Sequence, residues 1–288
     1  MPKLRIGAHT STAGSLANAA REALELGCNC FQIFTRSPRT WAAPDLKLEQ
    51  VAELKELRAK NDLTPLVVHG SYLLNLASGI AENRANSIAG FRDEVQRSLA
   101  IGANYLVFHP GSAKDHDSAE AAIASLADAF AEATKGLRWN GLEVLLENTA
   151  GGGATLGRDL GELAEIRAAI LRKKRNAPIG YCLDTAHLYV SGYDIATEDG
   201  LEDVLHEIGD KLGLDRAKVL HTNDSKTKFA SRVDRHEHIG EGTIGAAAFR
   251  RILHHPKLRN KVFILETPHG RDGTHRKNVE ALKKLARG

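Results

Sequence analysis

Seven short apolar runs of this chain end on a residue type that commonly binds metal ions. In chain order, these terminal residues are His9, His69, His109, Glu147, Asp184, His221 and Glu266. If the runs are parallel strands of a closed barrel, their C-terminal ends lie on one face, where the active sites of such barrels are found. Imidazoles and carboxylates that meet there suit divalent metals of the zinc type. The pattern therefore constrains the fold and the chemistry together.

Strand-like and helix-like segments alternate along the whole chain. Strands are expected at 4–8, 28–34, 65–68, 104–108, 142–146, 179–183, 217–220 and 262–265, and helices at about 15–26, 48–60, 81–101, 118–134, from 158 onward, 197–212, 246–253 and 275–286. This alternation predicts a parallel sheet, and eight units predict closure into a (β/α)8 TIM barrel. We expect one α/β domain over residues 1–288, with a metal cluster at the C-terminal face of its strands.

An open, doubly wound sheet is the structural alternative. Such sheets usually have fewer strands and carry a Gly-rich nucleotide-binding turn after the first strand. Here the segment 9–14 reads HTSTAG, which lacks the G-x-G-x-x-G spacing. The barrel is therefore the better interpretation.

Composition excludes some classes of protein. The 288 residues fit one barrel of about 250 residues, and the net charge of +3 permits nucleic-acid binding without requiring it. The odd set of three cysteines shows no pairing pattern, which indicates a reducing compartment. No apolar run approaches the ~18–20 residues that cross a bilayer, and a strand begins at once after MPK, leaving no room for a signal peptide. We expect a cytoplasmic globular protein without a membrane partner.

Six consecutive predicted strands, the third to the eighth, end on candidate ligands. They are His69, His109, Glu147, Asp184, His221 and Glu266. A single histidine at a strand end is more often packed or hydrogen-bonded than bound to a metal, but packing hardly explains six in succession. The three carboxylates follow apolar strands, and a buried carboxylate is costly unless something compensates its charge. Divalent cations supply that compensation.

Two short patterns extend the set to nine. In the segment DTAH, His187 follows Asp184 by three residues, so the pair can serve neighbouring ions. Asp234 and His236 stand two apart in the long polar segment 222–245, where they would point the same way. Their neighbours Glu237 and His238 are expected to face solvent. Nine ligands imply two or three ions with a bridging carboxylate, and ions ~3.5–4 Å apart are typical of phosphoryl chemistry.

The chain resembles the endonuclease IV family of apurinic/apyrimidinic DNA repair endonucleases. The matching motifs are GAH at 7–9, FHPG at 108–111, LENTAG at 146–151, LDTAH at 183–187, HTNDSK at 221–226, RVDRH at 232–236, IGEG at 239–242 and LET at 265–267. Each motif is weak alone, but together they are highly specific. They extend over most of the chain, from Gly7 to about Pro268.

The resemblance implies a TIM barrel with three zinc ions, which manganese or iron could replace. By that resemblance, the first ion is held by His69, His109 and Glu147; the second by Glu147 as a bridge with Asp184, His221 and Glu266; and the third by His187, Asp234 and His236. The family usually has cysteine where this chain has Ala186. That cysteine is not a ligand in the family pattern, so no metal should be lost.

The resemblance also implies a reaction on double-stranded DNA. The enzyme would hydrolyse the phosphodiester 5′ to an abasic site, leaving a 3′-hydroxyl and a 5′-deoxyribose phosphate, by attack of a hydroxide held in the three-metal cluster. Glu147 would be the catalytic residue, because it bridges the metals and orients the nucleophile. Cleaning of blocked 3′ ends is expected as a second phosphodiesterase activity. The enzyme is expected to be a monomer of bacterial type, associated with the nucleoid through DNA.

Six further residues are expected to contact the DNA. By resemblance, Arg39, Tyr72 and Leu73 insert into the gap that the missing base leaves; the plain alternatives are a surface charge for Arg39 and a core position for Leu73. Lys226, Arg232 and Arg235 make the long loop basic, and we expect them to bind phosphates. A merely solvated loop is the alternative.

Two other functions remain open at this point. A sugar isomerase or epimerase of the same architecture would use one or two ions, and the extra motif at 234–236 argues against it. A DNA-damage binding module without catalysis would be metal-stabilised but inert. No ligand of the set is missing, so this second alternative ranks low.

Overall fold

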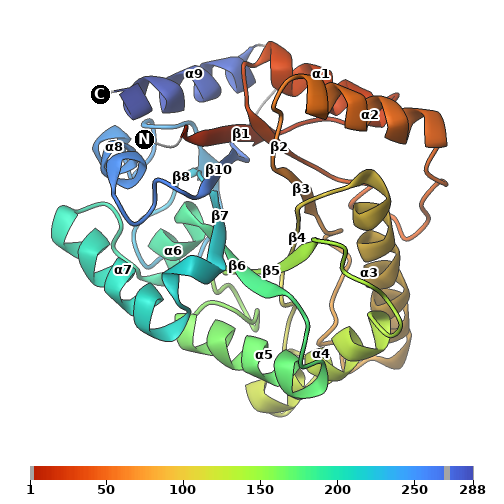
Figure 1. Ribbon diagram of the computed structural model, residues 1–288. Coiled ribbons are helices and arrows are strands. Elements are labelled where there is room, and N and C mark those ends of the chain that lie inside the picture. Colours follow the sequence, from red (N-terminus) through yellow and green to blue (C-terminus); the bar gives the residue numbers. More distant parts are fainter. Residues whose placement is uncertain (1–2, 269–272, 288) are drawn as a thin grey trace.

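The computed structural model describes residues 3–268 and 273–287. In this part of the chain, eight parallel strands close into a barrel in the order β1-β10-β7-β6-β5-β4-β3-β2 (Figure 1). Their bounds are β1 Arg5–His9, β2 Cys30–Ile33, β3 Leu66–His69, β4 Tyr105–Phe108, β5 Glu143–Glu147, β6 Ile179–Asp184, β7 Ala217–His221 and β10 Val262–Leu265. The predicted TIM barrel is confirmed.

Helices form a ring outside the strands (Figure 1). They are α1 Leu16–Glu25, α2 Leu48–Lys60, α3 Ala81–Ile101, α4 Ala119–Ala133, α5 Leu160–Lys173, α7 Glu198–Lys211, α8 Ala246–His254 and α9 Thr274–Arg287, with a short 3-10 turn at Leu214–Arg216. Polar side chains define several N-termini, as where the Ser118 hydroxyl accepts from the Ala121 amide and the Asp159 carboxylate accepts from the Gly161 amide. These helix positions agree with the sequence expectations to within a few residues.

Two elements were not expected from the sequence. The short helix α6, Thr185–Ser191, follows β6 without a connecting loop, and Asp184 caps it by accepting a 2.8 Å hydrogen bond from the His187 amide. The polar segment after β7 contains a small antiparallel ribbon of β8, Asp224–Ser225, and β9, His236–Glu237. Both elements lie in segments that contain candidate ligands.

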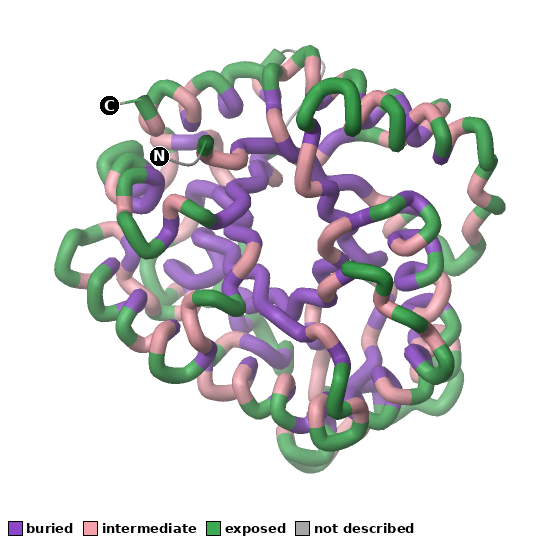
Figure 2. The backbone as a smooth tube through the Cα atoms, viewed as in Figure 1, coloured by how far each residue is buried: buried purple, intermediate pink, exposed green. Residues whose placement is uncertain are grey.

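The barrel strands are mostly buried (Figure 2), and the apolar core has two layers. The larger layer lies between the strands and the helices, and the smaller one fills the barrel interior with Cys30, Val67, Val107, Leu145, Cys182, Val219, Val262 and Ile264. Successive strand residues point to opposite faces, so strand β2 sends Phe31 and Ile33 toward the helices and Cys30 inward. Gln32 shares the inward face with Cys30.

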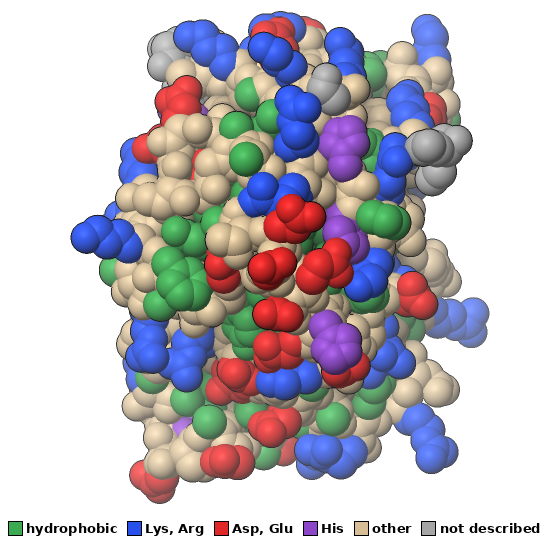
Figure 3. All heavy atoms as spheres, turned by 90° about the vertical axis from the view of Figure 1, so that its left-hand side faces the viewer, with side chains coloured by type: hydrophobic (Ala, Val, Ile, Leu, Met, Phe, Trp, Pro, Cys, Tyr) green, Lys and Arg blue, Asp and Glu red, His purple; other side chains and the backbone are tan. Residues whose placement is uncertain are grey.

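Acidic side chains gather on one flank of the barrel, where α7 and α8 lie (Figure 3). Helix α7 alone carries Glu198, Asp199, Glu202, Asp203, Glu207 and Asp210. The near-balanced net charge of +3 therefore conceals an uneven distribution. Within the described residues, we find no helix with the length and apolar character that a membrane crossing requires.

Candidate metal centre

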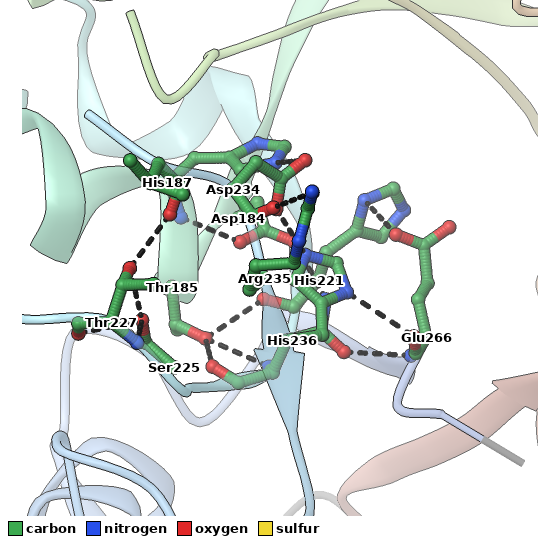
Figure 4. A network of polar contacts seen from close by, with 12 residues as sticks. Asp184, Thr185, His187, His221, Ser225, Thr227, Asp234, Arg235, His236 and Glu266 are labelled. Carbon is green, nitrogen blue, oxygen red and sulfur yellow. Dashed lines mark hydrogen bonds and ion pairs between the residues drawn. The ribbon is translucent and has the colours of Figure 1, made fainter. Parts of the chain in front are cut away.

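All nine candidate ligands come together at the C-terminal mouth of the barrel. Four of them are the last residues of their strands, namely His69, Glu147, Asp184 and His221, while His109 and Glu266 directly follow β4 and β10. His187 lies on α6, Asp234 precedes β9, and His236 begins β9. Figure 4 shows six of these side chains turned toward one another from different elements. Parallel closure of the barrel is what joins residues so distant in sequence.

Glu147 occupies the middle of the group and is almost completely buried. Its Oε1 lies 2.7 Å from Nδ1 of His221, whereas its Oε2 lies 3.1 Å from Nε2 of His69 and 3.3 Å from Nε2 of His109. The two carboxylate oxygens thus face two different sets of imidazoles. This is the arrangement that a carboxylate bridging two ions requires.

A second group surrounds His221. The Nδ1 of His221 lies 3.2 Å from Oε2 of Glu266, and the ligand atoms of Glu147, Asp184, His221 and Glu266 are all within 4.8 Å of one another. The first group, His69, His109 and Glu147, meets the same limit. The structure thus brings together the members of the first two groups that the family resemblance implies.

The third group contains His187, Asp234 and His236. Asp234 Oδ2 lies 3.2 Å from Nε2 of His187, and Asp234 Oδ1 lies 3.3 Å from Nε2 of His236. Asp184 also approaches this group, with Oδ2 at 3.7 Å from Nε2 of His236. Asp184 therefore stands between the second and third groups rather than within one alone.

The imidazoles are hydrogen-bonded as metal ligands usually are. The Nδ1 of His69, His187 and His236 lies 2.8, 2.9 and 3.2 Å from the backbone oxygens of Gly70, Asn148 and Glu266, respectively. Donation from Nδ1 leaves the Nε2 lone pair of each ring for an ion. The buried Nε2 of His236 makes no hydrogen bond among the described residues and has only its ion-pair contacts to Asp234 and Asp184, which leaves it available to a bound ligand. The donor set therefore fits divalent ions that accept mixed nitrogen and oxygen ligands.

The electrostatics of the group favour added positive charge. Burial opposes ionisation of Glu147, but the charges of His221 and His109 outweigh burial and hold its pKa well below the usual range. Burial likewise opposes protonation of His187, yet Asp184 and Asp234 raise its pKa to about 10. Burial would raise the pKa of Asp234, but its hydrogen bond to His187 lowers it to about 2. A proton on His187 thus offsets part of the carboxylate charge, and divalent ions would supply positive charge to the whole group.

Two asparagines support the ligands, and the sequence analysis gave them no role. Asn223 donates from Nδ2 to Oδ2 of Asp184 at 2.6 Å and accepts at Oδ1 from the Glu266 amide at 2.8 Å. Asn148 accepts at Oδ1 from the Asp184 amide at 2.6 Å. Asn148 lies in the LENTAG motif and Asn223 in the HTNDSK motif. Their place in these motifs is the sequence feature that could have indicated a functional role.

A buried carboxylate shapes the loop that follows the third group. Asp224 is fully buried and accepts backbone hydrogen bonds from Gly240, Gly242, Ile244 and Gly245 at 3.0 to 3.4 Å. A Cβ at Gly242 would overlap Oδ1 of Asp224, so only glycine fits there. The Asp224 carboxylate thus fixes the path of the backbone that follows Asp234 and His236.

Glu237 and His238 are half-buried rather than solvent-facing, which corrects the sequence expectation. Glu237 forms a 3.7 Å ion pair with Lys226, and His238 Nδ1 lies 2.9 Å from the side-chain nitrogen of Asn278. Pairing within the ribbon and contact with α9 account for their burial.

A cavity of about 700 Å³ opens beside the third group. Its lining includes His109, Asp234 and His236 together with three of the candidate DNA-contacting residues, Tyr72, Lys226 and Arg235. Tyr72 is 58 % exposed, and the centre of its ring lies 5.7 Å from that of His69. Arg39 and Arg232 are exposed and Leu73 is half-buried, and none of these three lines the cavity.

Comparisons with known proteins decide the family. A family model described as "Xylose isomerase-like TIM barrel" matches residues 20–285. A relative from Solibacter usitatus, "Probable endonuclease 4", is 50% identical over 283 residues, covering 98% of this chain and 97% of its own. The chain belongs to the endonuclease IV family. The crystal structure of endonuclease IV from Thermus thermophilus superposes with a TM-score of 0.86 at 36% identity, covering 98% of this chain and 99% of that one.

Sugar epimerases share the architecture of the endonuclease IV family. A D-psicose 3-epimerase from Clostridium cellulolyticum gives a TM-score of 0.69 at 15% identity, covering 99% of this chain and 98% of that one. Likeness at that identity concerns the fold alone. The high identity to the Solibacter relative thus outweighs the epimerase alternative.

Proposed function

We propose that this chain is an AP endonuclease of DNA repair. It hydrolyses the phosphodiester 5′ to an abasic site, leaves a 3′-hydroxyl and a 5′-deoxyribose phosphate, and cleans blocked 3′ ends by the same chemistry. The observation that supports this function best is the convergence of nine ligand-type side chains around the two-sided carboxylate of Glu147. Family membership favours a DNA-repair nuclease over the other activities of such barrels.

Three ion positions are part of the proposal, with zinc as the expected ion and manganese or iron as substitutes. The first lies among His69, His109 and Glu147, the second among Glu147, Asp184, His221 and Glu266, and the third among His187, Asp234 and His236. Divalent ions supply Lewis acidity to a phosphate and bring the pKa of a coordinated water from 15.7 to about 7.

The protein residues orient the reactants. The carboxylate of Glu147 stays ionised because of the imidazoles around it, so it can accept a hydrogen bond from the attacking water. Its burial at the strand end keeps that acceptor in one place. Asp234, with a half-exposed side chain at the cavity, lies where a phosphate could approach.

The DNA would bind across the barrel mouth. Lys226, Arg232 and Arg235 are exposed in the loop after β7, and exposed cations at such positions bind phosphates. Arg39, from the loop after β2, and Tyr72 and Leu73, from the loop after β3, are the side chains proposed to enter the duplex. The acidic flank at α7 would repel phosphates, which leaves the mouth as the favoured face (Figure 3).

The test is a nicking assay with the purified, zinc-loaded protein. The substrate is a labelled duplex with one synthetic abasic site, and the matched control is the same duplex with an intact base. We expect a nick 5′ to the abasic site whose 3′ end a DNA polymerase can extend. Binding without a nick would favour the binding module, and neither binding nor cleavage would favour an isomerase or epimerase.

The organisation of the protein also belongs to the proposal. We expect a single domain over residues 1–288 that acts as a monomer in the cytoplasm, at the DNA of the nucleoid. Size-exclusion chromatography with light scattering tests the monomer, since a stable dimer would double the measured mass.

A further inference from the structure

A buried amide side chain lies beneath the second ligand group. Gln32, on the inward face of β2, is fully buried and touches three other strands or strand ends. Its Oε1 lies 2.8 Å from Nε2 of His221, and its Nε2 lies 2.5 Å from Oε1 of Glu266 and 3.0 Å from Nδ1 of His9. The site proposed above uses neither Gln32 nor His9.

The chemistry of these partners fixes the orientation of the amide. An ionised carboxylate only accepts hydrogen bonds, so the NH2 group of Gln32 must face Glu266. The carbonyl oxygen then faces His221, and it can be satisfied there only if Nε2 of His221 carries a hydrogen. The reversed amide would set two oxygens against each other at 2.5 Å. The network thus admits one orientation.

This orientation decides which nitrogen of His221 can bind an ion. With hydrogen on Nε2, the neutral ring has its lone pair on Nδ1, which is the atom nearest to Glu147 and Glu266. The second hydrogen of the Gln32 amide points to Nδ1 of His9, whose ring packs 4.4 Å from Phe34. Strands β1 and β2 contribute none of the nine candidate ligands, but through His9 and Gln32 they support the hydrogen-bond network.

We propose that Gln32 is a positioning residue for the second ion. It keeps His221 in the form that binds through Nδ1 and directs Glu266 toward the same ion. This inference rests on the proposed function only in treating the cluster as a metal centre. Backbone oxygens orient the rings of three other candidate ligands, His69, His187 and His236. His221 is oriented by a side chain instead, and a substitution of Gln32 can remove that support.

The first test measures zinc affinity. Gln32→Met keeps the side-chain length and removes both hydrogen-bonding groups, and Ile33→Met is the matched control because its side chain faces the helix layer. Titration against a competing chelator should show one of three zinc ions bound about 10–100-fold more weakly in Gln32→Met. The control should match the parent. Three unchanged affinities in folded Gln32→Met would overturn the proposal.

The second test needs no variant, so it decides the matter even if Gln32→Met does not fold. Proton–nitrogen correlation spectra of the zinc-loaded parent, labelled at histidine, report which ring nitrogen carries hydrogen. We expect hydrogen on Nε2 of His221 and metal on Nδ1, and the opposite pattern would overturn the proposal. This result does not depend on nicking. If His221 carries hydrogen on Nε2 but the protein cleaves no DNA, the role of Gln32 stands and the proposed function is refuted.

Discussion

Among single side chains, Glu147 has the largest predicted effect on activity. Glu147→Gln keeps the side-chain shape but replaces one carboxylate oxygen by an NH2 group. That group only donates hydrogen bonds, so one of the two sides of the side chain loses its acceptor. Loss of a residue that supports a ligand costs about 10–100-fold, so loss of a bridging ligand should reduce cleavage by more than about 100-fold. DNA binding, measured by fluorescence anisotropy, should survive because the exposed cations are unchanged.

Glu143→Gln is the control, since Glu143 begins the same strand at the opposite end of the barrel. It is half-buried and lies 3.9 Å from Lys218, far from the candidate ligands. The control should cleave like the parent. Full cleavage by Glu147→Gln would refute the role assigned to the carboxylate.

Arg232 offers a second prediction at a single position. Each phosphate contact releases counterions, so the logarithm of the DNA affinity falls linearly with the logarithm of the salt concentration. Arg232→Gln should reduce that slope by about 0.9. Anisotropy titrations over a series of salt concentrations measure it, with Arg84→Gln on α3 as the control. Equal slopes for Arg232→Gln and the parent would show that this loop is merely solvated.

The loop between β2 and α2 is joined to helix α3 by several side-chain contacts. Asp93 on α3 accepts from Arg36 of the loop at 2.9 Å and from Arg97 at 2.7 Å, and Thr35 donates to Glu94 at 2.8 Å. Arg97 also donates to the backbone oxygen of Pro44. These contacts fix the position of the loop that contains Arg39.

Removal of Arg97 should therefore loosen the loop. We expect Arg97→Leu to lower the free energy of unfolding by roughly 1.5–3 kcal/mol, the range for hydrogen bonds to charged groups. Hydrogen exchange in 35–44 should accelerate and binding to abasic DNA should weaken, while the zinc content stays the same. Arg84→Leu removes the partly exposed ion pair between Arg84, on the same helix, and Glu132, and it should change stability by no more than about 0.5 kcal/mol. Equal effects from both variants would contradict this account.

Glu94 makes the same region sensitive to pH. Burial raises its pKa and outweighs the hydrogen bond from Thr35 and the charge of Arg36, and its Oε1 has no hydrogen-bond partner among the described residues. The folded chain thus keeps a proton that the unfolded chain loses above its ordinary value of 4.5. The free energy of unfolding should decline from that pH up to the raised pKa, by at most about 1.4 kcal/mol per pH unit. Urea titrations of Glu94→Gln should show a shallower decline.

Sequence patterns predicted the strands well because each is an apolar run with a clear boundary. They missed α6, since DTAH reads equally well as a turn leaving a strand, and they missed Gln32, which lies inside an apolar strand and is not a typical metal ligand. Its role depends on β2 lying beside β1 in a closed barrel, near His221 and Glu266. Sequence spacing alone does not show such contacts across the barrel.

For the protein as a single folded body, bound ions should act as cross-links between strands. The candidate ligands come from the ends of β3, β4, β5, β6, β7 and β10 and from α6 and β9. An ion present at 100 times its dissociation constant stabilises the folded chain by about 2.7 kcal/mol. Calorimetry should therefore show a lower Tm after treatment with a chelator. Added zinc should restore the Tm, and an unchanged Tm after verified metal removal would argue against three structural cross-links.

The position of Glu266 has a consequence for biosynthesis. This ligand follows β10, the last barrel strand to leave the ribosome, whereas His69, His109 and Glu147 emerge much earlier. A nascent chain could therefore capture one ion with its first half, but it could not complete the second ion's coordination until all eight strands had been translated. If the proposed ions bind, full metallation would be a late step in maturation, and the proposed cleavage could begin only after the final strand has been translated.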